Sequence, residues 1–239
     1  MLHIRPLLES DLPAALHLST QAGWNQLAPD WLRLLRLFPS QCLAGCLHEQ
    51  LIATATLATY ENRLGWIGMI LVDPAHRSKG HGIAMFDAIL ALADQLAIPT
   101  LALDATDLGE PLYRKRGFLP STPINRWLTP IATHSHRHIP TPCPTPSESD
   151  WPDILALDHA SANIDRSPLL GALAGEPNAR LRILRESCRL VGFAFARPGR
   201  FHRPLPQTSP DSRTSPSHEA SWCSPRGCWL RCRGASSAR

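Results

Sequence analysis

The sequence predicts an α/β protein with a mixed central sheet, and three observations lead to this expectation. An uncharged run of nine residues, Leu64 to Val72, lies between Arg63 and Asp73 and is typical of a strand buried on both faces. A basic loop with two glycines follows it, and a segment with apolar residues at helical spacing follows the loop. The chain has 239 residues, 44% of them hydrophobic, which is enough for a packed core.

Elements expected before and after that strand complete the layout. Two helices are expected first, at residues 11–21 and 29–37, and then a strand that includes residues 42–46. A helix from Ile83 to Leu96 follows the glycine loop, and another strand is expected from Thr100 to Asp104. The apolar residues of that helix are Ile83, Phe86, Ile89, Leu90, Ala93 and Leu96.

The chain also repeats itself at an offset of 139 residues. The first block, Glu9-Ser10-Asp11, Pro13, Leu16 and Leu18, returns as Glu148-Ser149-Asp150, Pro152, Leu155 and Leu157. In the second block, Leu51 and Ala55 return at the same offset as Leu190 and Ala194, and Leu47 and Glu49 return two residues short of it as Leu184 and Glu186. Two blocks at one spacing favour a duplication in which a capped helix precedes a strand pair.

The repeat stops abruptly after its first part. Residues 197–212, which correspond to 58–73 of the first copy, contain four prolines, and proline does not occur in a central strand. We therefore expect a partial second unit at residues 148–197. A truncation, or a change of reading frame near Pro198, is the hypothesis that explains the loss of pattern.

Two further segments have compositions that do not favour a fold. Residues 129–147 contain five prolines and are expected to be a linker, in which His134, His136 and His138 lack a scaffold for a metal site. Residues 198–239 contain eight serines and six prolines among few apolar residues, which predicts a disordered tail.

The tail alone carries a net charge of +5, so it accounts for the whole positive excess of the chain, whose net charge is +4. Residues 1–128 carry 10 basic and 11 acidic side chains, residues 129–197 seven of each, and residues 198–239 seven Arg against two acids. An Arg-rich tail could bind nucleic acid, but this one lacks a stacking platform or an ordered scaffold, so no nucleic-acid partner is expected. No run approaches the roughly 20 apolar residues that span a bilayer, so no membrane association is expected. Seven scattered cysteines favour a reducing cytoplasm.

The loop between Val72 and the helix has the features of an anion site. Backbone N–H groups at a helix start have no intrahelical acceptor, and the helix dipole favours an anion there. Gly80 and Gly82 let a phosphate approach the backbone, while Arg77 and Lys79 add positive charge. Neither a Walker loop nor a three-glycine dinucleotide fingerprint is present. The residues expected at a diphosphate are Arg77, Ser78, Lys79, Gly80, His81, Gly82 and Ile83.

This region resembles a known family. Arg-x-x-Gly-x-Gly, here Arg77 to Gly82, after a strand ending in Val-Asp-Pro is similar to the acetyl-CoA loop of the GNAT N-acetyltransferase superfamily. Gly109 to Phe118 resembles that superfamily's late helix and its Tyr-x-x-x-Gly-Phe signature. The resemblance covers nearly all of residues 1–128 and implies the GNAT fold, a mostly antiparallel sheet flanked by helices. It also implies that residues 148–197 begin a second GNAT-like unit, in a tandem layout.

The resemblance implies a reaction and several of its residues. A primary amine would attack the thioester of acetyl-CoA directly, with no metal, and must lose its proton first because alkyl amines have a pKa of about 10.4. Backbone N–H groups near Leu71 and Val72 would stabilise the oxyanion. Tyr113 would protonate the departing thiolate.

The resemblance does not identify the general base. Family members often carry a Glu or His on the fourth strand, but Leu64 to Val72 contains no titratable side chain. The candidates are Glu61 at the preceding turn, Asp104 at the end of the fifth strand, and a chain of waters. Asp104 is equally suited to capping the turn that follows it.

The acceptor side is expected in the loop between the first two helices. Trp24 and Asn25 occupy the position of acceptor-lining residues in the family, although Trp24 also suits a hydrophobic lid over the core. The leading expectation is an acetyl-CoA-dependent N-acetyltransferase. The alternative is a non-catalytic acetyl-CoA-binding or interaction protein with a degenerate second half. The sequence leaves the acceptor amine and the oligomeric state open.

Overall fold

The computed structural model describes residues 1–123, 143–197, 199 and 225–232 of the chain. The strands are β1 (His3–Pro6), β2 (Cys42–Leu47), β3 (Gln50–Tyr60), β4 (Leu64–Val72), β5 (Thr100–Thr106), β6 (Leu119–Thr122), β7 (Arg180–Glu186), β8 (Arg189–Ala196) and β9 (Pro225–Cys232). The α-helices are α1 (Leu12–Gln21), α2 (Ala28–Leu37), α3 (His81–Gln95), α4 (Glu110–Lys115), α5 (Trp151–Ala162) and α6 (Ser167–Ala174). Short 3-10 turns η1 (Glu9–Asp11), η2 (Pro39–Gln41), η3 (Pro74–His76) and η4 (Glu148–Asp150) connect them.

The larger sheet has seven strands in the order β1-β2-β3-β4-β5-β9-β6. All neighbours are antiparallel except β4 and β5, which are parallel because α3 crosses over between them. The expected mixed, mostly antiparallel sheet is therefore confirmed. The strand expected at Leu64 to Val72 has those bounds in the structure.

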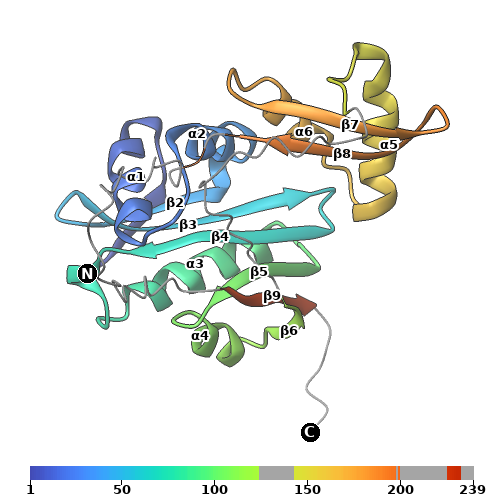
Figure 1. Cartoon of the computed structure of the whole chain (residues 1–239). Helices are drawn as coiled ribbons and strands as arrows, with labels where there is room; N and C mark the ends of the chain where they lie inside the picture. The colour runs from blue at the N-terminus through green and yellow to red at the C-terminus, as the bar shows by residue number, and fades with distance from the viewer. Residues whose placement is uncertain (124–142, 198, 200–224, 233–239) are drawn as a thin grey trace, which may run out of the picture.

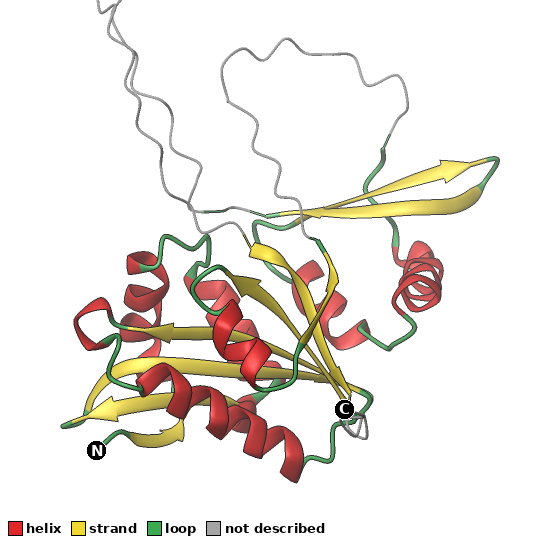
Figure 2. Ribbon diagram, turned by 90° about the horizontal axis from the view of Figure 1, so that it is seen from below, coloured by secondary structure: helices red, strands yellow, loops and turns green. Residues whose placement is uncertain are grey.

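Helices cover both faces of this sheet (Figure 1). On one face α1 and α2 pack through a core cluster that includes Leu18, Trp31 and Leu35. On the other face α3 packs through Phe86, Ile89, Leu90 and Ala93, as its periodicity predicts. Ile83 and Leu96, at the two ends of the expected apolar face, are exposed. Seen from below, α3 and α4 cross the near face of the sheet, and the β7–β8 hairpin projects beyond it (Figure 2).

Strand β9 corrects the expectation of a disordered tail. Residues 225–232 pair with β5 on one side, where Thr100 lies opposite Cys232, and with β6 on the other. The average composition of residues 198–239 conceals one short run, Gly227 to Leu230, that is mostly apolar. The edges of β5 and β6 can form backbone hydrogen bonds with this segment, and amino-acid composition gives no information about such partners. The rest of the predicted tail lies outside the described residues, apart from Gly199.

The second unit comprises α5, α6 and the two-stranded sheet of β7 and β8. Its core is small and consists of Ile154, Leu181, Ile183 and Leu190, with partly buried neighbours. Residues 143–147, predicted as linker, lie against it: the Ile183 N–H donates to the Pro144 carbonyl at 3.1 Å. The linker histidines His134, His136 and His138 lie outside the described residues.

The two units share backbone irregularities at the 139-residue offset. The β2–β3 turn places His48 and Glu49 at φ of 47° and 68°, and the β7–β8 turn places Ser187 and Cys188 at 47° and 69°. Both hairpins shift register at corresponding points, Gly45/Cys46 and Leu184/Arg185. The capping contact of Asp11 with the Leu8 N–H also recurs, between Asp150 and the Ser147 N–H. These correspondences extend the sequence repeat to details of local geometry.

None of the helices in the described part of the chain is long and apolar enough to cross a membrane.

Candidate active site

The sheet opens between β4 and β5. The two strands pair only from Leu64 with Thr100 to Ile67 with Leu103. Beyond Ile67, β4 continues to Val72 with β3 as its partner, whereas β5 continues with β9. Because each central strand has two hydrogen-bonding edges, this divergence leaves the second half of β4 with an edge that β5 does not use.

A bulge in β4 lies at this opening. Thr54 of β3 lies opposite Leu71 and Thr56 lies opposite Gly68, so Ala55 faces two residues of β4, Met69 and Ile70. Met69 has a φ of 49°, in the left-handed region that non-glycine residues seldom adopt. The hydroxyl of Thr54, which is fully buried, donates to the Met69 carbonyl at 2.8 Å. The bulge is therefore held by a side chain of the neighbouring strand.

The glycine loop joins the C-terminal end of β4 to α3. Gly80 is the N-cap of α3 and has a φ of 82°, a conformation that favours glycine. A Cβ added to Gly82 would contact only the Val72 side chain, at 3.6 Å, so the fold itself tolerates a side chain there. The first helical bond runs from the Ala84 N–H to the Gly80 carbonyl, and the N–H groups before it lack an intrahelical acceptor.

The cations of the loop bond to nearby carbonyl groups. Arg77 Nε donates to the Val72 carbonyl at 3.1 Å, and Lys79 Nζ donates to the Ala75 carbonyl at 3.0 Å. Both side chains are exposed, and such contacts exchange easily with water or with an anion. Asp73 begins the turn, because its carboxylate accepts from the Ala75 N–H at 2.8 Å; this bond contributes most to lowering its pKa. Positive charge and unpaired N–H groups therefore gather where β4 ends.

Tyr113 lies in α4 and is buried beside aromatic residues of the core. Its ring centroid is 5.0 Å from that of Phe86 and 6.4 Å from that of Phe118. Burial raises the pKa of its phenol to about 12, so the hydroxyl is protonated at neutral pH. A Cβ on Gly109 would lie 2.8–2.9 Å from the edge of this ring and its hydroxyl, so only glycine leaves room for the phenol. The sequence singled out Tyr113 but gave no sign of this packing.

The arrangement of strand, bulge and glycine loop lies within a segment that is similar to a known protein family. Residues 6–118 match the acetyltransferase (GNAT) family. This segment contains the divergent strands, the bulge, the glycine loop and Tyr113. Just under half of the chain is therefore similar to this family.

Two similarities extend beyond residues 6–118. The uncharacterized N-acetyltransferase YitH of Bacillus subtilis (strain 168) is 27% identical over 194 residues. The match covers 80% of this chain and 66% of YitH, just under two thirds of that relative's length. The crystal structure of a protein from Pyrococcus horikoshii, named as an acetyltransferase, has a TM-score of 0.59 at 19% identity. It covers 77% of this chain and 68% of that one, which shows a common fold.

A third similarity is confined to about half of this chain. N-acetylglutamate synthase from Neisseria gonorrhoeae, in a structure complexed with coenzyme A and L-arginine, is 23% identical with a TM-score of 0.45. The match covers 51% of this chain and 28% of that protein.

The structure separates the two candidate bases. Glu61 lies in the tight turn between β3 and β4, with a φ of 50°. Five residues separate Leu64 from Met69, so Glu61 is at least about 17 Å along the strand from the bulge. Asp104 directly follows Leu103, the last residue of β5 that pairs with β4, and its side chain is exposed. Asp104 is therefore at the opening, whereas Glu61 is at the far end of β4.

The remaining predicted site residues lie near the core clusters on the two sides of β4. Leu71 faces the α1–α2 side and is buried, whereas Val72 is partly buried against the α3 side. Trp24 lies in the loop between α1 and α2 and packs with Met69 against one core cluster. Asn25 follows in the same loop. The predicted acceptor loop is thus in contact with the cluster that contains the bulge residue.

Two groups of residues at or near the site were not expected from the sequence. Thr54 holds the bulge, and its only sequence signal is a threonine within an apolar strand. Asp30 and Arg33, on the acceptor side, form ion pairs with distant residues that no local pattern indicates. Within the described ranges, no group of three His, Cys, Asp or Glu side chains is arranged to hold a metal ion.

Proposed function

We propose that this protein is an N-acetyltransferase that transfers the acetyl group of acetyl-CoA to a primary amine by direct attack. The observation that carries the proposal is the coincidence of two features at one end of β4. The strand edge is open beside the Met69 bulge, and the glycine loop presents N–H groups a few residues later. A diphosphate on the loop would direct an extended arm of the cofactor along the open edge towards the bulge.

The chemistry follows from these positions. Arg77, Lys79 and the N–H groups around Gly80 and Gly82 would hold the diphosphate. Backbone N–H groups near Leu71 and Val72, beyond the part of β4 that β5 occupies, are the proposed donors to the oxyanion. These dipoles are fixed before the reaction, and donation to an oxyanion is worth more in such a preorganised setting than in water.

Tyr113 is the proposed general acid. A phenol is protonated at neutral pH, and burial, which raises the pKa of this one to about 12, keeps it so; its proton is available to the departing thiolate. Asp104, at the opening, or a chain of waters would accept the proton of the attacking amine. Glu61 is a poorer candidate because the length of β4 separates it from the bulge.

We also propose that residues 143–197 are the opening half of a second GNAT-like unit. The proposal is supported by the shared turn, the shared register shift and the shared capping contact at one offset of 139 residues. The first unit continues beyond this point with β4 and its loop. The second unit has no equivalent of that loop in the described residues, so acetyl-CoA is assigned to the first.

Release of coenzyme A thiol from acetyl-CoA across a panel of amines tests the main proposal. Turnover with one amine class, lowered in Tyr113→Phe at unchanged acetyl-CoA affinity, is the expected result. Gly82→Asp should abolish cofactor binding, because it puts bulk and negative charge at the diphosphate, whereas Gly82→Ala, which the fold tolerates, adds bulk alone and should weaken binding less. Acetyl-CoA binding without turnover on any amine would instead support the non-catalytic alternative.

A further inference from the structure

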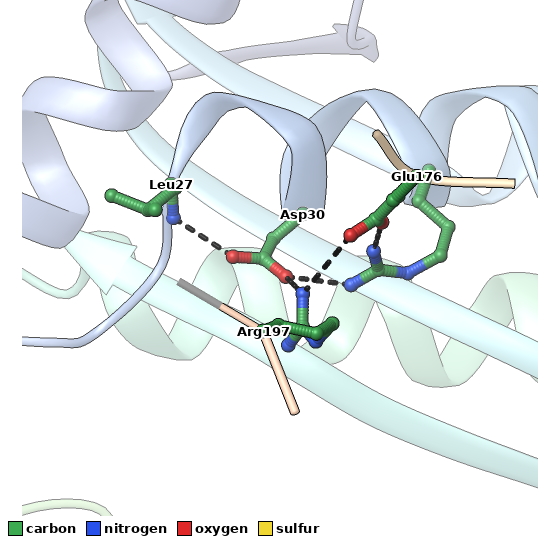
Figure 3. Close-up of polar contacts among 5 residues, drawn as sticks. Leu27, Asp30, Glu176 and Arg197 are labelled. Atoms are coloured by element: carbon green, nitrogen blue, oxygen red, sulfur yellow. Dashed lines mark hydrogen bonds and ion pairs between the residues drawn. The ribbon is translucent and has the colours of Figure 1, made fainter. Parts of the chain in front are cut away.

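Four charged side chains join the two units beside the acceptor loop (Figure 3). Asp30 and Arg33 belong to α2 of the first unit, whereas Glu176 follows α6 and Arg197 follows β8 in the second. Arg33 pairs with Asp30 at 2.6 Å and with Glu176, and Arg197 pairs with Asp30 and, at 3.7 Å, with Glu176. Each guanidinium thus contacts both carboxylates, and the group as a whole is neutral.

The group is too well shielded from water to be a set of ordinary surface ion pairs. The side chains of Asp30, Arg33 and Glu176 are only 10%, 12% and 18% exposed, and Arg197, at 33%, covers them from the second unit. Burial alone would raise the pKa of Asp30, but hydrogen bonds from the Leu27 N–H, Arg197 and Arg33 together lower it. Removing one cation would leave a shielded carboxylate short of partners, which costs more than the loss of an exposed pair.

Asp30 connects this group to the acceptor loop. One of its carboxylate oxygens accepts from the Leu27 N–H at 2.8 Å, where the loop enters α2, and the other accepts from Arg33 and Arg197. Gly199, just beyond Arg197, lies against the loop itself. A Cβ on Gly199 would come within 2.6 Å of the Asn25 carboxamide, so the backbone passes directly over that side chain.

The same loop is linked to the bulge through a shared core cluster. Trp24 and Met69 pack against one core cluster, which also contains Leu71. A displacement of the loop therefore changes the surroundings of the proposed reaction centre without touching the glycine loop, which lies beyond the end of β4. The acceptor side is therefore positioned by the loop between α1 and α2, whereas the cofactor side is positioned by the glycine loop before α3.

We propose that the second unit is a positioning element for the acceptor loop, acting through Arg197 and Glu176 on Asp30 and through Gly199 on Asn25. The proposal rests on the function proposed above. In this arrangement the second unit needs no cofactor and no active site of its own. It supplies the carboxylate of Glu176, the guanidinium of Arg197 and the backbone contact of Gly199, which hold residues 24–30 beside the core cluster that Met69 also contacts. Arg197 and Glu176 are positioning residues and do not touch the reacting atoms.

Kinetics of the full chain provide the first test. Arg197→Ala should raise KM for the amine about three- to tenfold while kcat and the Kd of acetyl-CoA stay within about twofold. Arg197→Lys keeps the charge and should restore most of the amine KM. Arg189→Ala removes an exposed arginine of β8 and should change none of the three values. An unchanged amine KM in Arg197→Ala, or equal losses in amine and acetyl-CoA affinity, would overturn the proposal.

Hydrogen exchange provides a second test that does not depend on turnover. Amides of residues 22–30 should exchange several-fold faster in Arg197→Ala than in the wild-type chain or in Arg189→Ala, beyond any change in the rest of the first unit. If no amine is acetylated by the wild-type protein, the proposed function fails, yet faster exchange still supports the positioning role. Exchange that is unchanged at residues 22–30, or equally increased throughout the first unit, refutes that role.

Discussion

Thr54→Val tests whether a buried hydroxyl maintains the Met69 bulge. The substitution keeps the volume of the side chain and removes the donor to the Met69 carbonyl, now at 2.8 Å. A side-chain hydrogen bond of this kind contributes about 1 kcal/mol, and a carbonyl left partly buried without its partner adds a similar cost. A φ of 49° at methionine already costs about 1–2 kcal/mol, which the surrounding contacts must offset. We therefore expect a loss of about 1–2 kcal/mol in the free energy of unfolding.

The expected effect on turnover is larger than the effect on stability. If the bulge relaxes towards a regular strand, the N–H groups after Met69 turn to the other edge, because successive residues of a strand alternate. The proposed donors to the oxyanion are then lost, and each such donor is worth about 10²–10³ in rate. Acetyl-CoA should still bind through the glycine loop.

Urea unfolding and thiol release measure the two effects separately. Thr54→Ser is the matched control, because it keeps the hydroxyl and removes only a methyl group. The serine variant should lose about 1 kcal/mol of stability through the smaller apolar area and retain most turnover. A valine variant with wild-type turnover, or a serine variant as inactive as the valine variant, would refute the role of the hydroxyl.

Three further predictions concern single groups. The free energy of unfolding should decline as pH rises from 10 to 12, because the folded Tyr113 phenol, with its pKa raised to about 12, keeps its proton while the unfolded one loses it; Tyr113→Phe should abolish that component, as urea titrations at several pH values can show. Gly80→Ala should cost about 1 kcal/mol of stability because of its φ of 82°, whereas Gly82→Ala should cost less; equal losses in thermal unfolding would contradict this reasoning. Arg166→Ala should destabilise the second unit by about 1–3 kcal/mol, because the Asp158 side chain is only 4% exposed and would lose its partner, although Arg166 itself is 37% exposed; proteolysis of residues 143–197 should rise accordingly, and no change would contradict it.

The sequence was most informative where one segment determines its own structure. The run from Leu64 to Val72 forms a strand with those bounds, and the helix expected from Ile83 begins two residues earlier, at His81. Gly80 lies in the loop directly before that helix, as expected, and its φ is positive. In each case the local pattern of apolar residues and glycines contains the decisive information.

Features that depend on two distant segments were not predictable in the same way. The bulge at Met69 requires Thr54 on another strand, and methionine gives no local sign of a positive φ. The pairing of Asp30 with Arg197 joins residues 167 positions apart. The tail was predicted wrongly at β9 because an average over 42 residues hides an eight-residue strand whose partners lie elsewhere. Tertiary partners, rather than propensity, decide such segments.

The place of β9 makes the first unit discontinuous in the chain. β6 ends at Thr122 and β9 begins at Pro225, yet the two are neighbours in one sheet, so the second unit is an insertion between them. During synthesis, the sheet of the first unit must therefore wait for residues 225–232 before its β5 and β6 edges are paired. Closing so long a loop adds little to the equilibrium cost, since each doubling of loop length costs about 0.6 kcal/mol, but it slows folding. Separating the two units by cutting the chain between them would leave β9 on the wrong fragment.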